Sequence, residues 1–205
     1  MCNLYRLDLP AAAVASLFRV PPSTPTNAGG EVYPGQPGLV VTDTAARAMV
    51  WGFPLGRRGR SGERLKPRFI NNARDDRLDS PFWRSSLVHR RCLVPISAFA
   101  EAAGEPGHKT RTWISHPAGD LLAGAGIWRE SEEWGACFSL VMTRANAQLS
   151  SVHDRMPVLL HPRDWHDWLR APADDARRLC LPYDGDLRVE KTSQRWNSRR
   201  PPSSA

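Results

Sequence analysis

Residues 121–127, LLAGAGI, and residues 138–142, FSLVM, are short apolar runs of the length expected for buried β-strands. Turn-forming and polar residues separate the two runs, and the same pattern recurs along the chain. Further strands are predicted at residues 39–42, 48–51, 92–94, 112–114, 156–160 and 187–189. Helical patterns are predicted at residues 82–88, 145–152, 162–170 and 173–180. Together these elements predict an α+β fold: a single β-rich domain with several short flanking helices.

The first predicted helix starts near Pro10 and has Val14, Leu17 and Phe18 on one stripe. The same stretch resembles the apolar part of a secretory signal, but Asp8 and Pro10 interrupt it, so an amphipathic helix is the better interpretation. Residues 21–38 are rich in Pro, Thr and Gly and are predicted as a loop. The domain is expected over residues 1–197, with residues 198–205 as a disordered tail.

The chain has 205 residues, of which 41% are hydrophobic and eight are Trp, enough for the core of one ordinary domain. No apolar run approaches the roughly eighteen residues of a membrane span, which excludes a transmembrane helix. The 28 basic residues exceed the 21 acidic residues, and all but three of the basic residues are Arg. Two explanations of this bias stay open: an anionic partner such as nucleic acid, or a GC-rich genome.

Basic residues gather in three stretches, at residues 57–68, 89–91 and 195–200. The first contains Gly and is predicted as a flexible loop that tracks a phosphate backbone, with Trp51 and Trp83 nearby to stack an unpaired base. For the last stretch a solvated surface is the preferred interpretation.

The four cysteines, at positions 2, 92, 137 and 180, show no paired metal-ligand spacing. His161 and His166 are five residues apart and would not share a helix face. No metal and no cofactor are therefore predicted.

Cys2 directly follows the initiator Met1, so loss of Met1 would give it a free α-amine beside its thiol. Reference pKa values of about 7.7–8.0 for the amine and about 8.5 for the thiol leave both with nucleophilic fractions near neutral pH. Such a pair can trap an aldehyde twice, first as an imine and then as a five-membered thiazolidine.

Four motifs occur in one order along the chain. They are MCNLY at residues 1–5, INNAR at 70–74, RCLVP at 91–95 followed by Phe99 and Glu101, and HDRMP at 153–157. Together they resemble the SOS-response-associated peptidase (SRAP) family, whose members crosslink to abasic sites in single-stranded DNA. The resemblance spans residues 1 to about 160 and is supported by YPG at residues 33–35 and VWGFP at residues 50–54.

Carried over position by position, the resemblance implies that Cys2 is the nucleophile and that Asn72, Glu101 and His153 surround it. An Asn amide both donates and accepts, so Asn72 suits holding the amine or the sugar oxygen. Glu101 is expected to move protons to and from the amine, and His153 to protonate the sugar ring oxygen as the aldehyde forms. The DNA-binding residues expected are Arg6, Pro34, Trp51, Arg74 and Arg155, with Arg74 and Arg155 on the phosphates flanking the lesion.

The chain departs from the family pattern at several positions. Asn3 and Leu4 replace the usual Gly-Arg after the cysteine, so two outcomes stay open for one phosphate contact: it is lost, or it moves to Arg6. Ala100 and Ala102 replace the aromatic residues that usually flank the glutamate. Loss of a stacking platform is expected to lower DNA affinity by roughly 1–3 kcal/mol per base.

The resemblance implies a cytoplasmic abasic-site sensor that joins the nucleoid when it binds damaged DNA, shields the lesion and acts as a monomer. Two alternatives stay open. Cys2 and His153 can instead form a thiol peptidase or N-terminal-nucleophile hydrolase. The chain can also be a noncovalent single-stranded-DNA-binding module in which Cys2 has no part.

Overall fold

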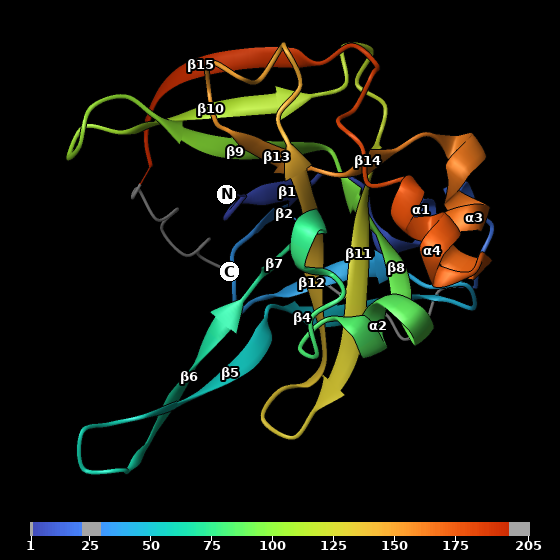
Figure 1. Ribbon diagram of the computed structural model, residues 1–205. Helices are drawn as coiled ribbons and strands as arrows, with labels where there is room; N and C mark the ends of the chain where they lie inside the picture. Colours follow the sequence, from blue (N-terminus) through green and yellow to red (C-terminus); the bar gives the residue numbers. More distant parts are fainter. Residues whose placement is uncertain (1, 22–29, 197–205) are drawn as a thin grey trace.

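The computed structural model describes residues 2–21 and 30–196, which form two sheets, a separate hairpin and short helices (Figure 1). Within these residues, no helix combines the length and apolarity needed to cross a bilayer. The predicted β-rich α+β domain with short flanking helices is confirmed. The tail expected at residues 198–205 lies outside the described residues.

A barrel-like sheet forms the centre of the fold. Its strands pair in a circle, because β12 hydrogen-bonds to β4 on one edge and to β11 on the other. The strands in this circle are β12 (Gly135–Arg144), β4 (Ala46–Trp51), β3 (Pro37–Val41), β8 (Arg91–Ile96) and β11 (Leu122–Ser131). Closure leaves these five strands without a free edge over the paired residues.

The apolar runs at 121–127 and 138–142 become the neighbouring strands β11 and β12, as predicted. The small residues of β11 let the sheet close tightly. A Cβ atom added at Gly126 would lie 2.8 Å from Cys92 Sγ on β8, closer than side chains approach. Glycine at this position therefore permits the close contact between β8 and β11.

Three short strands extend the barrel beside β12. β7 (Asn72–Arg74) runs parallel to residues 140–142, next to β4 on the same edge. β13 (Arg155–Pro157) pairs with residues 142–144 on the other edge, and β14 (Leu159–Leu160) pairs with β11. The two strands β7 and β13 therefore flank the C-terminal end of β12.

A second sheet covers one end of the barrel (Figure 1). Its strand order is β15 (Arg188–Arg195), β10 (Thr110–Ser115), β9 (Ala98–Ala103), β1 (Tyr5–Leu7) and β2 (Gly30–Val32). Because β1 pairs with β9 on one side and β2 on the other, the N-terminal strand is fixed inside this sheet. The start of the described chain is thereby held next to residue 101.

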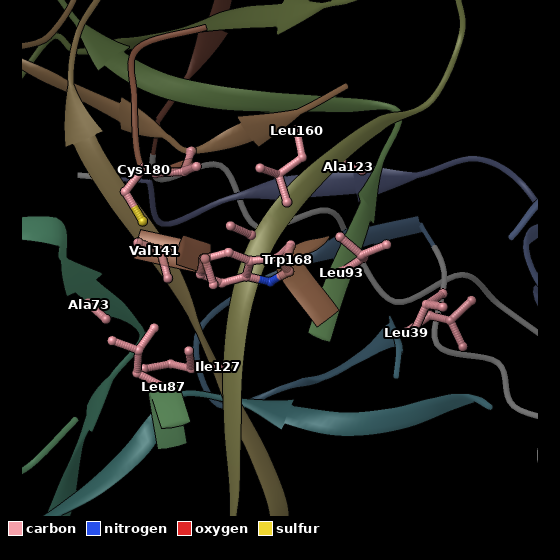
Figure 2. Packing of buried hydrophobic residues seen from close by; sticks show 14 of the residues in the cluster. Leu39, Ala73, Leu87, Leu93, Ala123, Ile127, Val141, Leu160, Trp168 and Cys180 are labelled. Carbon is pink, nitrogen blue, oxygen red and sulfur yellow. The ribbon is translucent and has the colours of Figure 1, made fainter. Parts of the chain in front are cut away.

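The helices pack on the outside of the barrel. They are α1 (Ala11–Leu17), α2 (Arg84–His89), α3 (Trp165–Arg170) and α4 (Ala173–Arg178), with single 3-10 turns at Asp75–Arg77 and Pro162–Asp164. Figure 2 shows Trp168 of α3 among aliphatic side chains of β8, β11 and β12. Its indole N–H donates to the Cys92 carbonyl at 2.9 Å, which satisfies the polar atom of a fully buried ring.

Three predicted elements are wrong. Residues 145–152 form turns instead of a helix, because the Asn146 side chain accepts from the Leu149 N–H at 3.1 Å and donates to the Tyr183 carbonyl. The loop predicted at residues 21–38 contains β2 and the start of β3, while its residues 22–29 lie outside the described chain. The basic stretch at 57–68 belongs to a hairpin of β5 (Phe53–Arg58) and β6 (Arg64–Ile70).

Candidate functional site around Cys2

Cys2 lies in the core beside β1, and none of its surface is exposed to solvent. Its thiol donates weakly to the Leu4 carbonyl, with 3.6 Å between sulfur and oxygen. The hydrogen bond from the Ala100 N–H to the Leu4 carbonyl, 2.9 Å long, ties the same segment to β9. The sulfur therefore has a fixed position at the junction of the two sheets.

Two neighbouring amides hold the main chain of Cys2. The Nδ2 atoms of Asn71 and Asn72 donate to the Cys2 carbonyl at 3.0 and 2.8 Å. Asn71 also donates to Asn3 Oδ1 at 3.0 Å, and its own carbonyl accepts from Trp51 Nε1 at 3.0 Å. This clamp spans almost seventy residues of sequence and fixes where the nitrogen and sulfur of Cys2 point.

Asn72 contributes a second polar atom that the fold does not use. The residue is 8% exposed, and within the described parts of the chain its buried Oδ1 atom has no hydrogen-bond partner. A buried acceptor without a donor costs roughly 1–3 kcal/mol. An N–H or O–H donor brought within hydrogen-bond distance of Oδ1 would remove that cost.

Glu101 lies on β9 and is 4% exposed. Burial raises the pKa of its carboxyl to about 7, and the charge of Asp154 acts in the same direction. The pKa of the Cys2 thiol is raised well above its ordinary value, mainly by burial and then by the negative charge of Glu101. At neutral pH the thiol is therefore protonated, while Glu101 keeps its proton to a higher pH than an exposed carboxyl group does.

His153 precedes β13 and has 26% of its side chain exposed. In the neutral ring, Nδ1 accepts from the Arg155 N–H at 2.9 Å, which leaves the proton on Nε2. When the ring is protonated, the Asp154 carboxylate 2.7 Å from Nδ1 stabilises the charge. Burial lowers the pKa of the ring, so His153 is mainly neutral near pH 7.

The structure connects all four predicted catalytic residues through these interactions. Asn72 bonds Cys2 directly, and the charge of Glu101 acts on the Cys2 thiol. Asp154, which contacts His153, acts in turn on Glu101. Among the residues that the structure describes, no three His, Cys, Asp or Glu side chains gather as metal ligands would.

The SOS response associated peptidase (SRAP) family model matches residues 1–199. The chain belongs to the SRAP family. This confirms the resemblance carried by the four motifs. The curated relatives of this SRAP chain include the abasic site processing protein YoqW of Bacillus subtilis, 28% identical over 135 residues. The match covers 60% of this chain and 59% of YoqW, so the chain spans about three fifths of that relative.

A second curated relative, the abasic site processing protein YMR114C of Saccharomyces cerevisiae, is 29% identical over 102 residues. That match covers 48% of this chain and 28% of the yeast protein.

Two solved structures share the SRAP fold seen here. A protein from Bordetella bronchiseptica matches with a TM-score of 0.78 and 23% identity, over 93% of this chain and 99% of that one. A protein from Bacteroides thetaiotaomicron matches with a TM-score of 0.75 and 19% identity, over 92% and 91% of the two chains. At these identities the likeness establishes the fold alone.

The arginines expected on DNA phosphates in this SRAP domain are held by carboxylates. Arg74 contacts both carboxylate oxygens of Asp76, at 2.9 and 2.5 Å. Arg155 pairs with Asp75 at 3.1 Å and reaches Asp76 at 3.8 Å. The two guanidinium groups thus share one acidic turn directly after β7.

The remaining DNA-binding predictions have different surroundings. Arg6 pairs with Asp8 at 3.2 Å and lies over the Trp113 ring, and Pro34 is half-buried in the turn after β2. Trp51 is fully buried, with its ring edge-on to Tyr5 at 5.0 Å between centroids. Trp83 is buried as well, so neither ring that was predicted to stack a base presents an exposed face in this structure. Trp51 instead supports Asn71.

Sequence reasoning missed three residues of the site. Asn71 and Asp154 lie inside the INNAR and HDRMP motifs, next to residues that were chosen. Asp75 directly follows the INNAR motif and is part-buried against Arg155. Position within a motif was a signal for the first two, but only the fold shows which neighbour points at Cys2.

Proposed function

We propose that this SRAP chain processes abasic sites in single-stranded DNA by covalent capture through Cys2, after Met1 has been removed. The names of its relatives support a role at abasic sites. The geometry supports a capture mechanism, because two amides and one carboxyl group surround a residue that has both a nitrogen and a sulfur nucleophile.

The reaction balances without an oxidant or a metal. Hydrolysis of the Met1–Cys2 peptide bond consumes one water and frees the Cys2 amine. The amine adds to the aldehyde carbon of the ring-opened sugar, and loss of one water leaves a C=N bond. The sulfur then adds to the imine carbon while the thiol proton goes to the imine nitrogen, which closes a thiazolidine.

Glu101 is the proposed proton carrier for both additions. Its pKa of about 7 lets the carboxylate accept a proton from the amine or the thiol and return it at similar cost. The protonated state of the Cys2 thiol makes such a base necessary, because the sulfur must lose its proton as the carbon–sulfur bond forms.

Asn72 and His153 act on the two reactants. The buried Oδ1 of Asn72 would accept from the new Cys2 amine, while its Nδ2 keeps the Cys2 carbonyl in place. His153 would protonate the sugar ring oxygen as the abasic residue opens, with Asp154 stabilising the imidazolium that precedes proton transfer.

Arg74 and Arg155 would bind the phosphates on either side of the lesion. Each holds an aspartate in the DNA-free protein, and a phosphate would compete for the same planar donors. Sequence preference should be weak, since the lesion lacks a base and the contacts go to the backbone. The captured lesion would be shielded from strand cleavage at damaged DNA in the nucleoid, by a protein that acts as a monomer.

The observation that carries this proposal is the convergence of Asn72 and Glu101 on Cys2. Intact mass spectrometry before and after mixing with an abasic oligonucleotide tests it. We expect loss of the Met1 mass and then a denaturation-resistant adduct of the protein plus the oligonucleotide minus one water. Cys2→Ala should keep noncovalent binding and form no such adduct.

Retention of Met1 together with an absence of adduct would overturn the proposal. So would an adduct of equal yield with Cys2→Ala, which would place the nucleophile elsewhere. Multiple turnovers on a fluorogenic peptide without any adduct would favour the thiol peptidase.

A further inference from the structure

The β5–β6 hairpin extends away from the body of the protein and carries most of its unbalanced charge (Figure 1). Between Phe53 and Ile70 the hairpin has a single acidic residue, Glu63. Its six basic residues are Arg57, Arg58, Arg60, Arg64, Lys66 and Arg68, and all six are exposed. Such a charge excess on one element has a strong electrostatic field and attracts anions.

The fold does not neutralise these charges. Within residues 2–21 and 30–196, none of the six cations forms an ion pair, although Glu132 and Glu133 lie on the nearby β11–β12 turn. Glu63 accepts from the Ser61 N–H and so belongs to the turn itself. Arg58 and Arg64 stand directly opposite each other in the register. Like charges in such a pair destabilise a hairpin unless an anion screens them.

The base of the β5–β6 hairpin is fixed against the barrel by side-chain contacts. Arg129 donates to the Pro54 carbonyl at 3.0 Å and lies over the Phe53 ring. The Phe69 ring stacks on Trp134 of the β11–β12 turn, with 4.1 Å between centroids. These contacts fix the base of the hairpin against the barrel, and the charged residues lie beyond them.

Both strands of the hairpin lead directly into the Cys2 site. β5 begins two residues after Trp51, and β6 ends at the residue before Asn71. The hydrogen bond from Trp51 Nε1 to the Asn71 carbonyl joins the two ends. A polymer bound at Cys2 could therefore place the segment next to its bound residue against the β5–β6 hairpin.

We propose that the β5–β6 hairpin is an arm that binds the sugar-phosphate backbone of DNA adjoining the Cys2 site, an inference that rests on the proposed capture of lesions in DNA. From Leu55 to Arg68 the hairpin has no aromatic residue, so it lacks a platform for stacking bases. Its guanidinium groups are suited to phosphate oxygens. The arm thus recognises charge along a strand and not its sequence.

A triple variant, Arg57→Gln, Arg64→Gln and Arg68→Gln, tests the arm on undamaged DNA. None of these three side chains makes a hydrogen bond within the described residues, so the hairpin should keep its fold. Affinity is measured by fluorescence anisotropy from 50 to 200 mM salt on a single-stranded oligonucleotide and on a duplex. Because neither probe contains an abasic site, failure of the capture chemistry does not affect the result.

We expect the slope of log affinity against log salt to become less steep by about 2 on the single strand or about 3 on the duplex. On the single strand, a difference of about 2 changes the affinity ratio between parent and variant about sixteenfold across this salt range. The probe that shows the loss identifies whether the arm follows single-stranded or paired DNA.

A matched control removes the same charge from the helical face: Arg163→Gln, Arg170→Gln and Arg178→Gln, all exposed on or beside α3 and α4. This control should keep the parental slope. A triple Arg→Lys version of the hairpin should also keep it, since the charge is retained. Equal slopes for the hairpin and helical variants on both probes would overturn the proposal, as would a Lys version that loses as much affinity as the Gln version.

Discussion

Replacing Glu101 with Gln tests two properties of the carboxyl group beside Cys2. One is whether its ionisation lowers the free energy of unfolding, and the other is whether it transfers protons during capture. Burial raises the pKa of this carboxyl from 4.5 to about 7. The folded protein therefore holds the proton more tightly than the unfolded chain does. The stability that the protonated form provides is complete below pH 4.5 and is lost as the pH rises through 7.

The size of the loss follows from the two pKa values. At 1.36 kcal/mol for each pKa unit, ionising Glu101 in the folded protein costs about 3 kcal/mol of the free energy of unfolding. Gln has nearly the same shape and no charge. The stability of Glu101→Gln relative to the parent should therefore rise by about 3 kcal/mol between pH 4.5 and pH 8, or roughly 6–12 °C in Tm for a chain of this size.

Thermal unfolding followed by circular dichroism at pH 4.5, 6 and 8 measures this difference, with Met1 processing checked by mass for each protein. Glu105→Gln, an exposed position in the turn after β9, is the matched control and should follow the parent at every pH. Glu101→Gln should form adducts slowly and lose the rise in rate through pH 7, whereas Glu105→Gln should keep both. A stability difference that does not change with pH, or a parental adduct rate, would refute the reasoning.

Three further predictions concern positions around the site. Gly38→Ala should lower the free energy of unfolding in urea by about 1–3 kcal/mol, because its Cβ would lie 2.0 Å from Tyr5 Oη. Gly56 has open space around it, so Gly56→Ala should change the free energy of unfolding by less than about 0.5 kcal/mol. Arg91→Met should lower the free energy of unfolding by at least about 3 kcal/mol, since the buried guanidinium donates to five main-chain carbonyls; an unchanged urea midpoint would contradict this. His153→Gln should slow adduct formation about a hundredfold in single-turnover gels while leaving Tm nearly unchanged, and a parental rate would exclude His153 as an acid.

Strands with strong apolar patterns were predictable from the sequence, and strands that depend on neighbours were not. The run in β12 contains the aromatic Phe138 and the β-branched Val141, and the run in β11 was identified by its short, continuous apolar stretch. β9 is rich in Ala, which has no preference for strands, and exists because β1 and β10 pair on either side of it. The basic stretch before residue 70 suggested a loop by its Gly and Arg content, although its two halves pair as a hairpin.

The candidate site could be proposed from the sequence where it depends on residue chemistry and motifs, but not where it depends on contacts between distant segments. Cys2 followed from its place after Met1, and Asn72, Glu101 and His153 followed from the motif resemblance. The hydrogen bond from Asn71 to Cys2 joins residues 69 positions apart, and no pattern along the chain indicates it. Exposure was equally hidden, because the sequence alone does not show whether an indole such as Trp51 faces solvent or the core.

The hydrogen bond between Trp51 and Asn71 closes the chain at the foot of the hairpin, twenty residues apart in sequence. A longer or shorter segment between these two residues changes the entropic cost of closing the loop little, by about 0.6 kcal/mol for each doubling of its length. The reach of the hairpin is thus free to diverge during evolution while the chemistry beneath it stays the same. For protein engineering, its tip is an insertion point where a reporter peptide or a different recognition sequence can be grafted.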